Sequence, residues 1–173
     1  SSVWNDRAFF DREANGIAHH EVYTAVIIQE IIPADYAFVI HTRNPNNQDE
    51  LVIEAVQGLG ESLVSGSEEY SGSPYRFIYN RKSEQIELVS FANKNKKLII
   101  ESGVMKSVLA SYREDWLATA EGREFLKAIA EAALKIEETF RSWPQDIEGA
   151  IVKQAMGWKA AFLQSRDQSL NGL

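Results

Sequence analysis

Short apolar runs rich in β-branched residues fill the chain from about Val22 to Ile100 and constrain its fold more than any other feature. Runs of this length, separated by turn-forming residues, are typical of strands. The cluster Asn44-Pro45-Asn46-Asn47 lies between two of them and predicts a turn. The region therefore predicts an antiparallel or mixed sheet, with strands at Val22–Ile32, Tyr36–Thr42, Leu51–Ala55, Tyr75–Tyr79, Gln85–Phe91 and Leu98–Ile100.

Helical patterns flank this region on both sides. Val3–Asn15 places apolar residues near one face, and Gly16 ends the pattern. Helical structure is expected again from about Gly103, and Pro144 ends it. Within this stretch, apolar residues at helical spacing predict an amphipathic helix docked on a core: Phe125, Ile129, Ala132, Ile136 and Phe140.

Two more strands, Ile147–Lys153 and Lys159–Ser165, are predicted to end the chain as a β-hairpin. The pattern allows an α/β or an α+β organisation. The fold class that we predict is α+β: a mixed or antiparallel sheet with covering helices and a terminal hairpin.

The net charge and the absence of cysteine exclude several classes of function. Eighteen Lys and Arg residues against 25 Asp and Glu residues give a net charge of −7, which disfavours nucleic acid and anionic membrane surfaces as partners. The lack of cysteine rules out a disulfide scaffold and a thiolate metal site. His19, His20 and His41 lack the spacing of a zinc site and are interpreted as structural or surface residues.

The predicted hairpin carries the strongest chemical signal. Residues two apart on a strand share a face, so Asp146 and Glu148 point the same way. A hairpin centred on Met156 would pair Asp146 with Arg166 and Glu148 with Gln164. All four side chains would then lie on one face, although a slip of one residue would separate them.

This set of groups suits a divalent cation that carries phosphates. Magnesium takes oxygen ligands from one or two carboxylates and completes its shell with water and phosphate, and an arginine can bind a phosphate with two hydrogen bonds. The alternative is a solvated strand face with a cross-strand Asp–Arg pair worth about 0.2–1 kcal/mol. The residue types alone leave both open.

Two other segments are weaker candidates for a nucleotide site. Gly58-Leu59-Gly60-Glu61 lies between a strand and a short helix, where backbone N–H groups could approach an anion, or it is a plain tight turn. Glu54, just before it, is either an inward acid that needs a partner or a surface residue. Gln29-Glu30-Ile31-Ile32 could present backbone groups to a purine edge, or belong to a buried strand.

Taken in order, these segments resemble the nucleotide-binding domain of the phosphoenolpyruvate synthase and pyruvate phosphate dikinase superfamily. The matching stretches are SVWNDRAFFDR, VIIQEIIPADYAFVIHTRNP, IEAVQGLGESLVSG, PQDIEGAIV and FLQSR. Three segments look closest to the alpha-glucan water dikinases: QEIIPADYAFVIHT, GLGESLVSG and SWPQDIEG. The resemblance runs from Ser1 to about Asp167.

The resemblance implies one lobe of an ATP-grasp fold at residues 1–168, followed by a tail at residues 169–173, and it implies ATP and Mg²⁺ as cofactors. By similarity, Gln29, Glu30, Ile31 and Ile32 form the hinge that contacts adenine. Glu54, Gly58, Gly60 and Glu61 border the nucleotide pocket. Asp146, Glu148 and Gln164 match the metal and phosphate ligands. Arg7, Glu148 and Arg166 are the expected catalytic residues.

Members of this family split ATP and pass its β-phosphate to the acceptor through a histidine on a separate mobile domain. In the water dikinases the acceptor is an alpha-glucan and water takes the γ-phosphate. The resemblance thus implies ATP, a glucan, an N-terminal ATP-grasp lobe and a phosphohistidine domain as partners. Neither of these two parts has a counterpart in the sequence, so we expect the chain alone to be inactive.

Two alternatives remain: the same lobe of a phosphoenolpyruvate synthase or pyruvate phosphate dikinase, and a non-catalytic remnant that binds nucleotide or a partner. The family ending QxRPQ reads Gln164-Ser165-Arg166-Asp167-Gln168 here, with an acid in place of proline. The expected location is cytoplasmic, or the plastid stroma if the chain comes from a plant.

Overall fold

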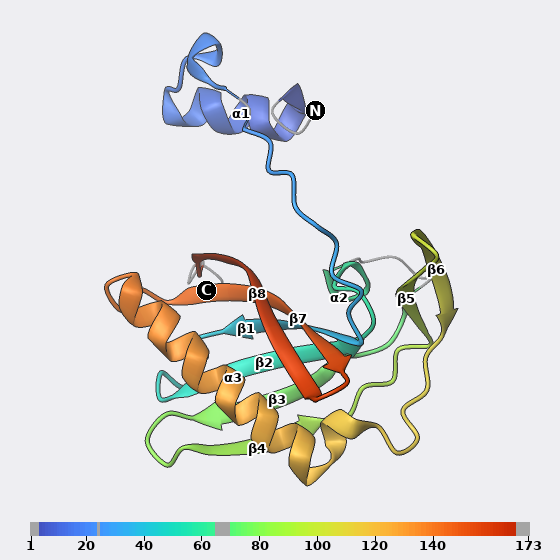
Figure 1. Cartoon of the computed structure of the whole chain (residues 1–173). Helices are drawn as coiled ribbons and strands as arrows, with labels where there is room; N and C mark the ends of the chain where they lie inside the picture. The colour runs from blue at the N-terminus through green and yellow to red at the C-terminus, as the bar shows by residue number, and fades with distance from the viewer. Residues whose placement is uncertain (1–3, 24, 65–69, 169–173) are drawn as a thin grey trace. The chain divides into compact units, whose positions relative to one another are not determined.

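The computed structural model describes residues 4–23, 25–64 and 70–168. The chain divides into two compact units, Ser1–Ile31 and Ile32–Leu173 (Figure 1). The first unit contains helix α1 (Asp6–Asn15) and a 3₁₀ turn, η2 (His19–Glu21). The Asn5 side chain caps α1 by accepting a hydrogen bond from the Ala8 N–H, and Gly16 ends the helix with φ 64°. The helix predicted at this end of the chain and its stop at Gly16 are confirmed.

The second unit is built on a six-stranded sheet with the order β4-β3-β2-β1-β7-β8, in which every neighbouring pair is antiparallel. A separate two-stranded ribbon pairs β5 with β6. The predicted α+β class with a C-terminal hairpin is therefore confirmed. The strands are β1 (Tyr36–His41), β2 (Glu50–Gln57), β3 (Tyr75–Asn80), β4 (Gln85–Ser90), β5 (Lys96–Glu101), β6 (Val104–Leu109), β7 (Gln145–Gln154) and β8 (Gly157–Asp167).

Helix α3 (Ala120–Thr139) crosses one face of the sheet and closes the core (Figure 1). Alternate residues of β1, namely Tyr36, Phe38 and Ile40, point into this core. The helix predicted from apolar spacing is confirmed, but its buried face differs by about one position. Ile129 is buried as expected, Phe140 is exposed, and the buried residues are Gly122, Leu126, Ile129, Ala130, Ala133 and Glu137.

Two further short helical elements are α2 (Glu61–Val64) and the 3₁₀ turn η4 (Trp116–Ala118). The first of them follows the glycine loop, as predicted; Ser65 and Gly66 of that motif lie outside the described residues. Within the described part of the chain, every helix is too short or too polar to cross a bilayer.

The structure corrects the helix predicted from about Gly103. Val104–Leu109 is a strand, β6, and it pairs with β5. The connection between them is two residues long, and both residues have positive φ, 53° at Ser102 and 76° at Gly103. This conformation is that of the tight hairpin turn whose twist matches paired strands, so the turn favours a ribbon over a helix.

The strand predicted at Val22–Ile32 is also wrong, because the described residues of this segment form no strand. Most of their apolar side chains lie in solvent, with Ile28 96% exposed. A strand needs a partner backbone as well as β-branched residues. The following strand, β1, already has β2 on one side and β7 on the other.

The C-terminal hairpin pairs the predicted residues at its open end, but its register changes once along the strands. At its open end Asp146 pairs with Arg166 and Glu148 with Gln164, as predicted. The turn, however, is at Ala155 and Met156, and from Gln154↔Gly157 down to Gly149↔Phe162 the register differs by one residue. A β-bulge at Leu163 absorbs this difference.

Opposite the bulge, Gly149 leaves no room for a side chain. A Cβ atom there would lie 2.1 Å from the Phe38 ring and 2.6 Å from the Ala161 carbonyl oxygen. The Phe38 ring packs edge-on against Phe162, with 5.8 Å between the ring centroids. The glycine thus allows the core aromatic pair and the bulged hairpin to coexist.

We therefore expect Gly149→Ala to destabilise the fold by about 1–3 kcal/mol, the usual cost of overpacking a core. The measurement is the free energy of unfolding from urea denaturation of the purified protein. Gly60→Ala is the matched control, because its Cβ would lie at an ordinary 3.5 Å from Ala37 Cβ. Equal stability of the two variants would contradict the packing argument.

Candidate functional site

The face of the sheet turned away from α3 carries the polar residues predicted for the site. Along β1, Val39 and His41 point to this face, because Tyr36, Phe38 and Ile40 point into the core. Cross-strand pairing places their neighbours on the same side. We call this set the carboxylate face, and it comprises His41, Glu54, Asp146, Glu148, Gln164 and Arg166.

Two parallel rows of side chains make up the carboxylate face. In one row, His41 of β1, Asp146 of β7 and Arg166 of β8 are register neighbours. In the other row, Glu148 is flanked by Val39 on β1 and by Gln164 on β8. The four residues that the hairpin prediction placed on one face are therefore together.

Asp146 is a largely enclosed acid of the carboxylate face: its side chain is only 14% exposed, against 30% for Glu54. Its Oδ1 atom lies 2.6 Å from Nδ1 of His41, and its Oδ2 atom lies 3.7 Å from Nε of Arg166. The Arg166 side chain is 64% exposed, so this ion pair is screened by water and weak. Arg166 is therefore free to exchange its carboxylate partner for a phosphate.

Glu54 extends the second row onto β2, where it pairs with Val39. Its side chain faces outward and forms a 3.9 Å ion pair with Arg76 of β3. This answers the question left open by the sequence: Glu54 is a partly exposed acid with a cationic partner. Beside it lies a cavity of about 270 Å³, lined by His41, Pro45, Val52, Glu54, Arg76, Asp146 and Gln168.

The glycine loop is bound to the fold through its own backbone. Gly58 has φ 81° and donates its N–H to Asp35 O at 2.7 Å, and Leu59 donates to Leu98 O at 2.9 Å. A side chain at position 58 would overlap the Leu98 carbonyl. In this structure the first two N–H groups of the loop thus bind the neighbouring backbone, as in a tight turn. Gly60 and Glu61 follow at the start of α2.

The remaining predicted residues, apart from Ile32, belong to the first unit. Arg7 lies on α1 with a 92% exposed side chain, 4.0 Å from Asp11. Gln29, Glu30 and Ile31 lie in an extended exposed segment of the same unit. Ile32 is the first residue of the second unit.

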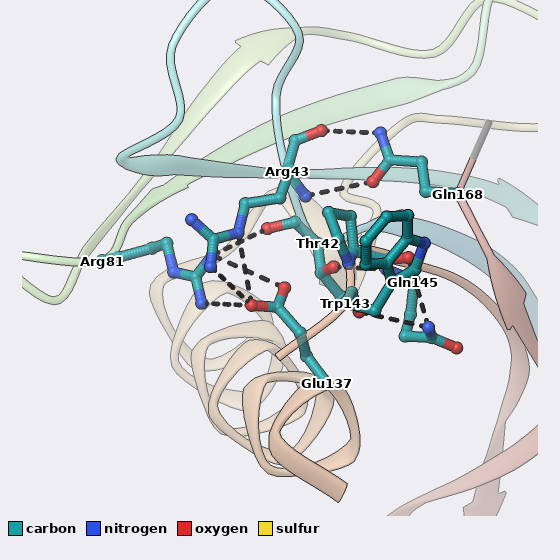
Figure 2. Close-up of polar contacts among 8 residues, drawn as sticks. Thr42, Arg43, Arg81, Glu137, Trp143, Gln145 and Gln168 are labelled. Atoms are coloured by element: carbon teal, nitrogen blue, oxygen red, sulfur yellow. Dashed lines mark hydrogen bonds and ion pairs between the residues drawn. The ribbon is translucent and has the colours of Figure 1, made fainter. Parts of the chain in front are cut away.

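A buried polar network clamps the ends of the strands that carry Asp146 and Arg166 (Figure 2). Glu137, near the end of α3, is 1% exposed and accepts hydrogen bonds at 2.8 Å from both Arg43 and Arg81. Thr42 and Gln145 exchange hydrogen bonds between the end of β1 and the start of β7.

Gln168 and Asp167 complete this clamp at the end of β8. The Gln168 side chain accepts from the Arg43 N–H and donates to the Arg43 carbonyl oxygen at 2.7 Å (Figure 2). The Asp167 side chain accepts from Gln145 Nε2 at 3.0 Å. The acid that replaces the proline of the family ending therefore continues β8 and binds β7.

Burial alone would raise the pKa of Glu137, but hydrogen bonds from Arg43, Arg81 and Thr42 outweigh it and hold the pKa below its usual value. The carboxylate therefore remains charged at neutral pH. It joins α3 to the loops that follow β1 and β3, and so links the core to the carboxylate face.

In the described residues, no group of three or more His, Asp and Glu side chains is arranged to hold a metal ion. The two carboxylates and one amide of the carboxylate face nonetheless fit the chemistry of magnesium bound to a nucleotide, because that ion takes the rest of its shell from phosphate and water. The donor set is therefore incomplete without a phosphate ligand.

Comparison with known proteins places this chain in one family. The family described as "Pyruvate phosphate dikinase, AMP/ATP-binding domain" matches residues 1–172. The chain belongs to this family of ATP-binding domains, as the sequence motifs had predicted.

The relatives are dikinases and phosphoenolpyruvate synthases. The chain is 33% identical to the chloroplastic alpha-glucan water dikinase of Solanum tuberosum over 87% of its length. It is 34% identical to a probable phosphoenolpyruvate synthase of Methanocaldococcus jannaschii over 88%, and 32% identical to the phosphoenolpyruvate synthase of Pyrococcus furiosus over 96%. The chain spans only 12%, 13% and 20% of the full length of these three relatives, respectively.

Two residues at this site were not predicted. His41 was interpreted as structural or surface, but it lies beside Asp146; the strand pairing that brings them together joins residues far apart in sequence. Glu137 follows Ile136 in the apolar stretch of α3, and its place in the buried stripe of that helix, one turn after Ala133, was the available signal.

We expect Glu137→Gln to lower stability by about 3 kcal/mol, because it leaves two arginines without their anion. Since the folded pKa of Glu137 lies below its unfolded value, its contribution is complete above the unfolded pKa and is lost as pH falls through the folded pKa. In the variant, the free energy of unfolding should therefore fall less between neutral and acidic pH, because no carboxylate is protonated at this position.

The measurement is the free energy of unfolding from pH 3 to pH 7. Glu138→Gln, a change of the exposed neighbouring acid, is the matched control. Similar stability and pH dependence in both variants would refute a role for the buried carboxylate.

Proposed function

We propose that this chain is the Mg-ATP-binding part of a dikinase that transfers the β-phosphate of ATP, through a phosphohistidine on a separate domain, to an alpha-glucan, while water takes the γ-phosphate. The observation that supports it most is the carboxylate face, where Asp146, Glu148, Gln164 and Arg166 lie side by side in register. The resemblance to the water dikinases in the motifs supports the choice of glucan.

In this proposal Asp146, Glu148 and Gln164 hold the cation through oxygen atoms, and Arg166 binds a phosphate oxygen. Bound magnesium would neutralise charge on the phosphates during transfer. Arg166 suits its role because its pairing with Asp146 is loose and its side chain is exposed. The polar clamp at Gln145 and Gln168 keeps the ends of β7 and β8 in place.

The other roles in the proposal come from the resemblance. Gln29, Glu30, Ile31 and Ile32 contact the adenine. Glu54, Gly58, Gly60 and Glu61 border the nucleotide. Arg7 reaches the phosphates. The proposed lobe comprises residues 1–168, with residues 169–173 as a tail, and it works with an upstream ATP-grasp lobe and a phosphohistidine domain.

A phosphoenolpyruvate synthase is the second candidate. The identity to the enzyme of Methanocaldococcus jannaschii is 34%, against 33% for the water dikinase of Solanum tuberosum, so overall identity does not separate the acceptors. The chloroplastic location of the potato relative supports the plastid stroma if the chain comes from a plant.

Transfer of label from [β-³²P]ATP decides between the acceptors. The full-length protein is incubated with a soluble alpha-glucan or with pyruvate. Label in the glucan supports the water dikinase, whereas label in phosphoenolpyruvate supports the synthase. A non-catalytic domain would transfer label to neither acceptor nor to a histidine of the protein.

We expect Glu148→Ala to abolish labelling of the phosphohistidine, a loss of at least about 100-fold if the carboxylate helps neutralise the transition state. The fold should survive, because the Glu148 side chain is partly exposed. Glu87→Ala on β4 is the control: it removes an exposed glutamate from the same sheet. Normal labelling in the Glu148 variant would remove the carboxylate face from the mechanism.

A further inference from the structure

We propose that His41 is a positioning residue that holds Asp146 as a one-oxygen ligand of the bound cation. This inference rests on the proposed function, since it takes Asp146 as a ligand of magnesium. It adds a residue that was interpreted from the sequence as structural or surface.

The two oxygens of Asp146 meet different partners. Oδ1 lies 2.6 Å from Nδ1 of His41, and because a carboxylate only accepts hydrogen bonds, the ring nitrogen must be the donor. Oδ2 faces Arg166 at 3.7 Å, beyond hydrogen-bond distance, and that side chain is largely exposed. Oδ1 thus already accepts a short hydrogen bond, whereas Oδ2 accepts none from the described residues, so Oδ2 is the oxygen that a cation would take.

The backbone fixes the distance between the two residues. His41 and Asp146 are cross-strand neighbours on β1 and β7. At the next position, Thr42 donates its N–H to Gln145 O at 2.9 Å, and the Gln145 N–H donates to Thr42 Oγ1 at 2.8 Å. Because β1 also pairs with β2 on its other side, His41 cannot shift without disturbing a central strand. The imidazole is thus a fixed donor for Asp146.

Glu148 provides an internal comparison. It occupies the same register position in the next row, where its β1 neighbour is Val39. A valine side chain donates no hydrogen bond, and among the described residues none donates one to the Glu148 carboxylate. The face therefore combines one acid whose orientation is fixed with one that is free to turn toward the ion. Groups behind a ligand that fix its orientation typically change metal affinity 10–100-fold when removed.

The test measures Mn²⁺ binding to the full-length protein by electron paramagnetic resonance, with a saturating non-hydrolysable ATP analogue present. His41→Phe keeps a planar ring but removes the donor. His41→Asn restores a donor, because its amide nitrogen takes the place of Nδ1. Asp146→Asn tests the ligand itself, and thermal denaturation shows which variants are folded.

We expect His41→Phe to weaken Mn²⁺ binding by about 10-fold, with His41→Asn close to the wild type. Unchanged binding in His41→Phe, with a loss in Asp146→Asn, would overturn the inference but keep the proposed function. Equal losses in folded His41→Phe and His41→Asn would also overturn it, because the donor would then not matter. Unchanged binding in Asp146→Asn would overturn the proposed cation site itself.

Discussion

The β-bulge at Leu163 determines which side chains of β8 share a face with Asp146 and Glu148. If the register of the hairpin turn continued along the strands, Leu163 and Ser165 would stand opposite these acids. The extra residue turns Gln164 and Arg166 to the carboxylate face instead. The amide and the guanidinium that a metal–phosphate site needs are therefore placed by one irregularity in the backbone.

The same irregularity depends on the core. Gly149 faces the bulge, and the Phe38 ring occupies the space that a side chain at this position would fill. On the same side of the sheet as Phe38, the buried Glu137 joins α3 to the arginines that follow β1 and β3. Removing one partner of such a buried cluster is costly, because it leaves the remaining charges without compensation. The carboxylate face is thus held from behind by aromatic packing and by one charged cluster.

The sequence pattern was sufficient to predict those features of the fold that depend only on residues close together in the sequence. The alternation of Asp146 and Glu148, the end of α1 at Gly16 and the strands from Tyr36 to Asn80 follow from such patterns. The bulge could not be predicted, because it lies opposite Gly149, where the Phe38 ring of a strand far away in the sequence fills the space for a side chain. The strand predicted at Val22–Ile32 failed for the related reason that propensity is local whereas strand pairing is not. The role of His41 depends in the same way on pairing between β1 and β7.

The charges of the carboxylate face link cation and nucleotide in the proposed function. Glu54, Asp146 and Glu148 contribute −3 and Arg166 contributes +1. Arg76, the ion-pair partner of Glu54, adds +1, so the face together with Arg76 has a net charge of −1. Such a surface repels a polyphosphate. A divalent cation held by Asp146 and Glu148 would change the sum to +1 and would release Arg166 from its loose pairing with Asp146. The cation and Arg166 would then both be available to phosphate oxygens. In the proposed function, cation and nucleotide would therefore bind with positive coupling, each raising the affinity for the other by the same factor.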